Sequence, residues 1–423
     1  MENTAAYSSD KPDTFKTLLR SLGPGIMMAA ASVGGSHLVA STKAGAIYGW
    51  QLAGLILLVN LFKYPFFRAG VQYTIGTRDT LVQGYAKLGR VYLIVFAVLT
   101  TISAVVNTAA LVLFSVSLLR FFIPFDVSTV TLSIGIIGVC LTILFAGHYK
   151  ALDSLSKLIM VSLSICTIIA AAIAFNQHAA TAVVVENPSP WTLAAIGFIV
   201  VTMGWMPAPI EVSSLTSVWL KSQCKQQRVT PRSALFDFNI GYVTTAILAI
   251  VFLSLGALVL NGSGVELSKS GVGFSQQLVS MYSSTIGEWA RPLISVVAFF
   301  CIFGSTITVI DGYSRVIAES QRLIMRKDSQ SQSTSFMWML IVSAVALAIL
   351  TFWASALLPM LNFAMILAFM TTPVFALLNY ILVTRTPLPE ELVMGPKMKM
   401  LSIAGLIYLF GFLALFIWWK WLM

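Results

Sequence analysis

The sequence predicts an all-α protein that crosses a membrane many times. Hydrophobic residues make up 58% of its 423 residues and charged residues only 10%, whereas a soluble globular protein has about 25% charged residues. Apolar runs of roughly 20 residues recur along the whole chain, and each is long enough to cross about 30 Å of hydrocarbon. The charged residues are too few to cover a surface that faces water, so the lipid bilayer is the expected partner.

Eleven apolar runs define the predicted transmembrane helices. They lie at approximately 23–48, 51–75, 91–119, 127–147, 151–175, 191–220, 234–260, 292–321, 335–357, 359–384 and 400–422. Lys and Arg concentrate in alternate loops, so the positive-inside rule places the N-terminus in the cytoplasm and the C-terminus outside a plasma or inner membrane. The formal net charge of +10 therefore reflects membrane topology, and we expect no binding to nucleic acid.

The predicted spans divide into two sets of five and one further helix. Residues 1–22 form a cytoplasmic N-terminal segment, and residues 23–175 form the first five-helix repeat. Residues 191–384 form the second repeat, and residues 385–423 form a loop and the eleventh helix. We see no Walker motif, nucleophile elbow, His-rich cluster or attached soluble domain in the sequence. The chain is therefore predicted to be neither an enzyme nor a cofactor-binding protein.

Two spans in corresponding positions of the two sets carry residues that interrupt helices. The first span contains Gly34, Gly35 and Ser36, and the sixth contains Pro207 and Pro209, which lack backbone donors. Paired broken helices indicate an inverted-repeat transporter with a site at the middle of the membrane. We therefore expect helices one and six to be broken and transport to proceed by alternating access. Close helix packing is the alternative explanation for the glycines, and a simple kink for the prolines.

Several segments resemble the Nramp (natural resistance-associated macrophage protein) family of divalent-metal transporters. In chain order they are GPGIMMAAASVGGSHLVASTKAGA, TIGTRDTLVQGYAK, the sixth-span MPAP, FGSTITVIDGYSRVIAESQRL and NFAMILAFMTTPVFALLNY. The resemblance covers nearly the whole chain. It implies a LeuT-like inverted repeat of 5+5 helices, a divalent metal ion as substrate, and symport coupled to H+ or Na+.

The sequence departs from the family pattern where that pattern binds metal. Members that carry manganese or iron have Asp-Pro-Gly-Asn in the first span, and the matching positions here are Gly34, Gly35, Ser36 and His37. The Met-Pro-His motif of the sixth span corresponds to Met206, Pro207 and Ala208. The third span, where the family usually has acidic residues, offers only Asn107. The resemblance therefore implies a divergent member with an altered site.

The candidate substrate site combines the two interrupted segments. Its predicted residues are Gly34, Gly35, Ser36, His37, Met203, Trp205, Met206, Pro207 and Ala208. His37 and Met206 are candidate metal ligands, because transition metals accept imidazole and thioether. Alternatively, consecutive backbone N–H groups at a half-helix start attract a carboxylate. The second hypothesis is therefore a small organic solute, such as an amino acid, an amine or a carboxylate.

Four polar side chains within the spans are candidates for coupling or gating. A carboxylate at mid-membrane costs about 2.5–3.5 kcal/mol, so Glu211 should face a cavity or a partner unless it snorkels to the interface. Asp311 precedes Arg315 by four residues, which favours an ion pair on one helix face. Asn107 lies in the third span and faces either the cavity or a packed neighbour. We expect Lys63, in the second span, to snorkel toward water.

Overall fold

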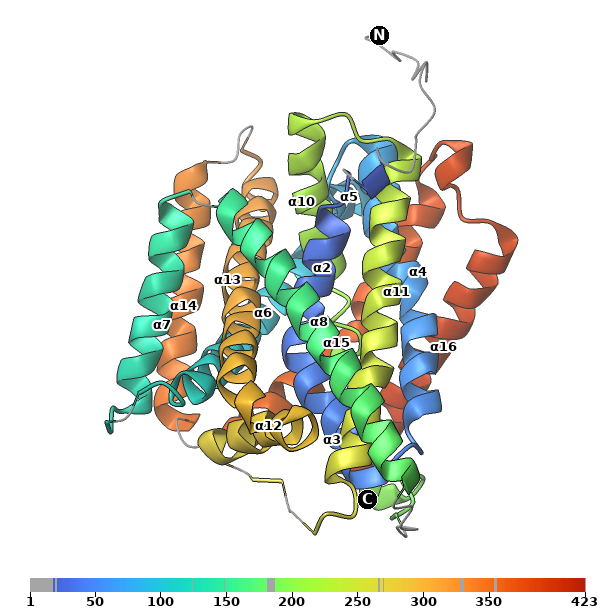
Figure 1. Ribbon diagram of the computed structural model, residues 1–423. Helices are drawn as coiled ribbons and strands as arrows, with labels where there is room; N and C mark the ends of the chain where they lie inside the picture. Colours follow the sequence, from blue (N-terminus) through green and yellow to red (C-terminus); the bar gives the residue numbers. More distant parts are fainter. Residues whose placement is uncertain are drawn as a thin grey trace.

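A computed structural model describes residues 18–19, 21–123, 125–147, 149–180, 187–264, 267–268, 270–327, 331–353 and 356–422. Every regular element within these residues is helical. Long helices pack side by side and cross one another at various angles, with α10 near one end of the bundle and α12 near the other (Figure 1). The prediction of an all-α protein is confirmed.

Helices occupy all eleven ranges that the apolar runs define. The first range holds α2 (Pro24–Ser32), the π-helix η1 (Val33–Ser41) and α3 (Thr42–Tyr48). The others hold α4 (Ala53–Thr77), α6 (Arg90–Leu119), α7 (Thr129–Phe145), α8 (Tyr149–Ala180), η2 (Leu193–Ala195), α9 (Ile196–Trp205), α10 (Val212–Gln226), α11 (Pro231–Leu255), η3 (Gly256–Leu260), α13 (Arg291–Ile324), α14 (Gln332–Trp353), α15 (Leu357–Arg385) and α16 (Pro396–Trp421). Between these elements lie α5 (Leu81–Leu88), α12 (Gly271–Ile286), η4 (Glu288–Ala290) and η5 (Glu390–Leu392). Seven helices of the described chain are long and apolar enough to cross a membrane.

The predicted break in the first span is wrong. The stretch around Gly34 and Gly35 stays helical as η1, in which the N–H of Thr42 donates to the carbonyl of His37, five residues earlier. The glycines allow neighbouring side chains to approach closely. A Cβ on Gly35 would lie 2.5 Å from Cζ3 of Trp205, and a Cβ on Gly34 would collide with Ser305. The alternative explanation of close packing therefore accounts for these glycines.

The predicted break in the sixth span is present. α9 ends at Trp205, and the next helix, α10, begins only at Val212. Met206 has extended backbone (φ −90°, ψ 119°), and the peptide between Met206 and Pro207 is cis. Prolines supply no N–H to an i−4 carbonyl, so the last carbonyls of α9 are left without helical partners.

The N-terminal end of the first span is hydrogen-bonded to α11, the seventh span. The carboxylate of Asp237 in α11 accepts hydrogen bonds from the backbone N–H groups of Gly23 (3.0 Å) and Gly25 (2.7 Å). A negative charge is favourable at the start of a helix. The backbones also touch, because a Cβ on Gly241 would collide with the carbonyl oxygen of Gly25. Small residues thus let the two helices pack closely.

Candidate functional site

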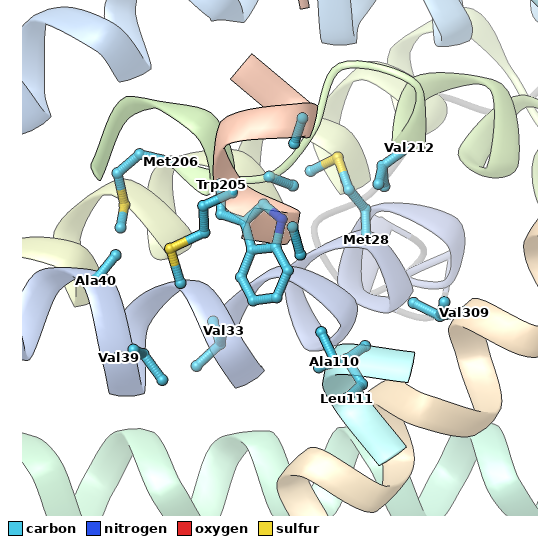
Figure 2. Close-up of a cluster of buried hydrophobic side chains, with 14 of the residues drawn as sticks. Met28, Val33, Val39, Ala40, Ala110, Leu111, Trp205, Met206, Val212 and Val309 are labelled. Atoms are coloured by element: carbon cyan, nitrogen blue, oxygen red, sulfur yellow. The ribbon is translucent and has the colours of Figure 1, made fainter. Parts of the chain in front are cut away.

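The broken sixth span meets the first span at the centre of the bundle. Figure 2 shows Trp205 and Met206, at the end of α9, among apolar side chains of the first span, α6 and α13. The labelled neighbours include Val33, Val39, Ala40, Ala110, Leu111 and Val309. Trp205 is only 4% exposed and Met206 is fully buried, so this conformation closes the site to bulk water.

Trp205 has an apolar and a polar side. Its ring lies against Gly35, where a side chain would overlap it. Its Nε1 is buried and has no hydrogen-bond partner among the described residues. A buried donor without a partner is costly, so it is suited to a ligand or a water molecule. Trp205 therefore combines close packing on the first span with a buried donor that no described group uses.

His37 faces α11 through one ring nitrogen. Its Nε2 donates to the carbonyl of Thr245 (2.7 Å), and its Nδ1 lies 2.6 Å from the hydroxyl of Ser36. The ring edge also packs against Phe252 of α11, with centroids 6.0 Å apart. A carbonyl only accepts, so Nε2 carries the proton and has no lone pair for a metal. His37 therefore links the first and seventh spans in this structure.

Two serines connect η1 to the break. The Ser36 hydroxyl lies 3.2 Å from the carbonyl oxygen of Pro207. The Ser41 hydroxyl donates to Sδ of Met206 over 3.7 Å. The two predicted ligands thus use their donor atoms differently, since His37 Nε2 binds a carbonyl of α11 and Met206 Sδ accepts from Ser41 of η1. Across the described residues, no group of three or more His, Cys, Asp or Glu side chains could hold a metal ion.

Lys63 of α4 is part of the site, although its sequence position suggested snorkelling. It is fully buried, and its Nζ donates to the carbonyls of Met203 (2.8 Å), Gly204 (3.1 Å) and Ala208 (3.3 Å). The expectation of snorkelling is wrong, because the carbonyls released by the break bind the ammonium inside the protein. The carbonyls of Met203 and Gly204 carry the negative end of the α9 dipole.

Three polar side chains form a hydrogen-bonded network at the start of α10. Tyr313 of α13 donates its hydroxyl proton to Oε1 of Glu211 (3.2 Å), and Nδ2 of Asn107 donates to the Tyr313 oxygen (3.2 Å). Oε2 of Glu211 and Oδ1 of Asn107 are buried and make no hydrogen bond within the described part of the chain. Glu211 and Lys63 also interact electrostatically. We call Asn107, Tyr313 and Glu211 the polar network.

Sequence reasoning found two members of the polar network and missed the third. Asn107 and Glu211 stood out because a polar side chain in an apolar span needs a partner. Tyr313 follows Asp311 by two residues and gave no separate signal. Asp311 itself forms the predicted ion pair with Arg315, whose Nε lies 2.7 Å from Oδ1.

The fold and the broken sixth span are those of a membrane transporter. The family model described as Nramp, natural resistance-associated macrophage protein-like, matches residues 25–419. The chain belongs to the Nramp family, and the resemblance seen in the sequence is confirmed.

One relative and two solved structures are similar to the chain along most of its length. An uncharacterized protein of Pasteurella multocida (strain Pm70) is 49% identical over 407 residues, which are 96% of this chain and 93% of that one. A crystal structure of a mutant manganese transporter of Eremococcus coleocola matches with a TM-score of 0.72 at 14% identity, over 98% of this chain and 89% of that one. Mhp1, a nucleobase-cation-symport-1 family transporter, matches with a TM-score of 0.56 at 13% identity, over 98% and 96% of the two chains. At such low identities these two structures establish the fold alone, which is LeuT-like.

Proposed function

We propose that the protein is a secondary-active transporter that works by alternating access around the break in the sixth span. The observation that carries this proposal is the pair of half-helices α9 and α10, with a buried carboxylate, Glu211, at the junction. Discontinuous helices place backbone groups and a charge inside the membrane, where a transported solute can be bound. A bundle containing spans one and six rocks against the remainder, within an inverted repeat of five and five helices.

The family points to a divalent metal ion as the substrate, bound at an altered site. Divalent cations prefer oxygen ligands, usually including a carboxylate. Glu211 Oε2 and Asn107 Oδ1 are buried oxygens without partners in the described chain, and they replace the acid that the first span lacks. The manganese transporter among the solved structures with this fold supports the same substrate class.

A small organic solute is the second candidate, and Lys63 favours it. The Lys63 ammonium already occupies the carbonyls at the end of α9, where its charge repels another cation. Trp205, the residue after Gly204, offers an indole N–H without a partner among the described residues. A solute with both an apolar part and hydrogen-bonding groups matches these features better than a bare ion.

Binding and uptake by the purified protein distinguish the two substrates. Isothermal titration with Mn2+, Mg2+, Zn2+, amino acids and amines identifies the class, and uptake into proteoliposomes measures transport. Saturable metal binding with uptake supports the first candidate. Binding of an organic solute without metal binding supports the second, and uptake of neither under an H+ or Na+ gradient contradicts the transport proposal.

We expect Glu211→Gln to abolish accumulation of substrate against a gradient and to leave substrate exchange in place. The amide keeps an acceptor for the Tyr313 hydroxyl but loses the charge that coupling to H+ or Na+ requires. Glu319→Gln is the matched control, because Glu319 is also a buried carboxylate of the bundle but pairs with Arg322. Wild-type accumulation by Glu211→Gln would exclude Glu211 as the coupling group.

A further inference from the structure

Lys63 binds the main chain of the broken helix. Three carbonyl oxygens, from Met203, Gly204 and Ala208, converge on its Nζ at 2.8–3.3 Å. An ammonium has three N–H donors and no acceptor. The three carbonyls therefore use all of its donors, and none is left for a substrate.

This group of carbonyls is a natural place for a cation. The last carbonyls of a helix lack intrahelical partners and carry about half a negative charge. The break turns the Ala208 carbonyl toward the same point as the carbonyls of Met203 and Gly204, so three oxygens surround one position. Backbone oxygens of this kind replace the hydration shell of free cations in other membrane proteins.

We propose that Lys63 is a tethered cation, whose ammonium permanently fills a cation site at the C-terminal end of α9 and so excludes free ions from it. The site then needs no exchangeable ion to hold the two half-helices in place. Lys63 acts as a specificity-determining residue, because any transported metal ion must bind on the Glu211 side of the break. The inference goes beyond the proposed function and holds for either substrate class.

Lys43 shows that burial alone does not produce this arrangement. Its side chain is also largely buried, but its Nζ donates to the side-chain oxygen of Asn362 (3.3 Å) and lies 5.7 Å from the centre of the Phe198 ring. Lys43 thus serves as a matched control for removing a buried ammonium away from the carbonyl group.

The test measures the thermal stability of purified Lys63→Ala in detergent, in choline chloride and then with Na+, K+ or ethylammonium at constant ionic strength. We expect a Tm below that of the wild type and a saturable rise of about 1–2 °C at tenfold excess over the dissociation constant. The wild type and Lys43→Ala should show no such rise. A structural role of the lysine stem alone would not be rescued by a free cation.

Two outcomes would overturn the proposal. One is a Lys63→Ala protein whose Tm does not respond to cations, whether that Tm equals the wild-type value or lies below it. The other is a wild type with the same cation response as the variant, because the ions would then bind elsewhere. Transport plays no part in this measurement, so its failure leaves the proposed function standing.

Further variants decide the matter if Lys63→Ala does not fold. The amide of Lys63→Gln can donate to the carbonyls but carries no charge. A rise in the Tm of this variant on adding a cation supports the tethered cation. A wild-type Tm without added cation contradicts it. If this variant does not fold either, Lys63→Arg decides. A folded Arg variant shows that the site requires a positive charge, whereas loss of all three variants shows that the packing of the lysine stem is limiting and overturns the proposal.

Discussion

The first and sixth spans begin the two sets of five, and they respond to interrupting residues in opposite ways. The first span keeps its backbone hydrogen bonds by passing through the π-helix η1. The sixth span ends at Trp205 and resumes at Val212. Both stretches are buried in the same region of the bundle, so burial does not explain the difference.

The difference lies in the backbone donors. Gly34 and Gly35 keep their N–H groups, so the helix can continue with a wider turn. Pro207 and Pro209 have no N–H, so the carbonyls before them must find other partners. Lys63 provides one such partner. Glycine pairs in a membrane span therefore indicate close packing at least as well as unwinding, whereas paired prolines are the stronger signal for a break.

The largest expected effect comes from adding a side chain at Gly35, on which the Trp205 ring packs. Gly35→Leu would force Trp205 away from the first span, and we expect a loss of about 3 kcal/mol in stability because overpacking of a dense core is not relieved easily. The folded yield on size exclusion and the Tm measure it. Gly138→Leu is the control, because a Cβ on Gly138 meets nothing within 4 Å. Equal stability of the two variants would show that the glycine does not serve close packing.

A smaller effect is expected at His37. His37→Ala leaves the Thr245 carbonyl without its side-chain donor and removes the ring from Phe252, at a cost of about 1–3 kcal/mol. His37→Gln keeps an N–H donor and should recover part of the loss in Tm. If His37→Ala unfolds like the wild type but loses substrate binding, the residue belongs to the substrate site and does not serve as a structural link.

The smallest effect is expected at Ser41 of the first span, whose hydroxyl contacts the sulfur of Met206 in the sixth span. Ser41→Ala removes the hydroxyl that donates to Met206 Sδ, and sulfur is a weak acceptor. We expect a change in stability below about 0.5 kcal/mol and unchanged substrate affinity, measured by thermal unfolding and titration. A large loss of affinity would mean that Ser41 contacts the substrate directly.

The helices were predictable from sequence because apolar length is a strong signal. All eleven ranges carry helix, and the break in the sixth span was recognised from Pro207 and Pro209. The number of crossings, the five-plus-five repeat and the orientation in the membrane stay predictions. The first span was misread, because the sequence does not reveal that Trp205 packs on Gly35.

The site was less predictable, because its contacts join distant parts of the chain. Glu211 and Asn107 could be singled out as polar residues in apolar spans, but Tyr313, which connects them, lies in a different helix. Lys63 was misjudged, because its partners are carbonyl oxygens, which every residue has. Hydropathy identifies a buried charge as unusual but does not say what neutralises it.

Because Lys63 binds main-chain oxygens, substitutions of Lys63 and of its partners should differ in their effects. The Lys63 ammonium binds the carbonyl oxygens of Met203 and Ala208, which remain when either side chain is exchanged for another of similar size. A mutational scan would therefore find Met203 and Ala208 more tolerant than Lys63, whereas Gly204 is restricted by its own contact with the Met365 backbone. Covariation among relatives would then couple Lys63 to Glu211, the acid with which it interacts electrostatically, and not to the residues whose carbonyls it binds.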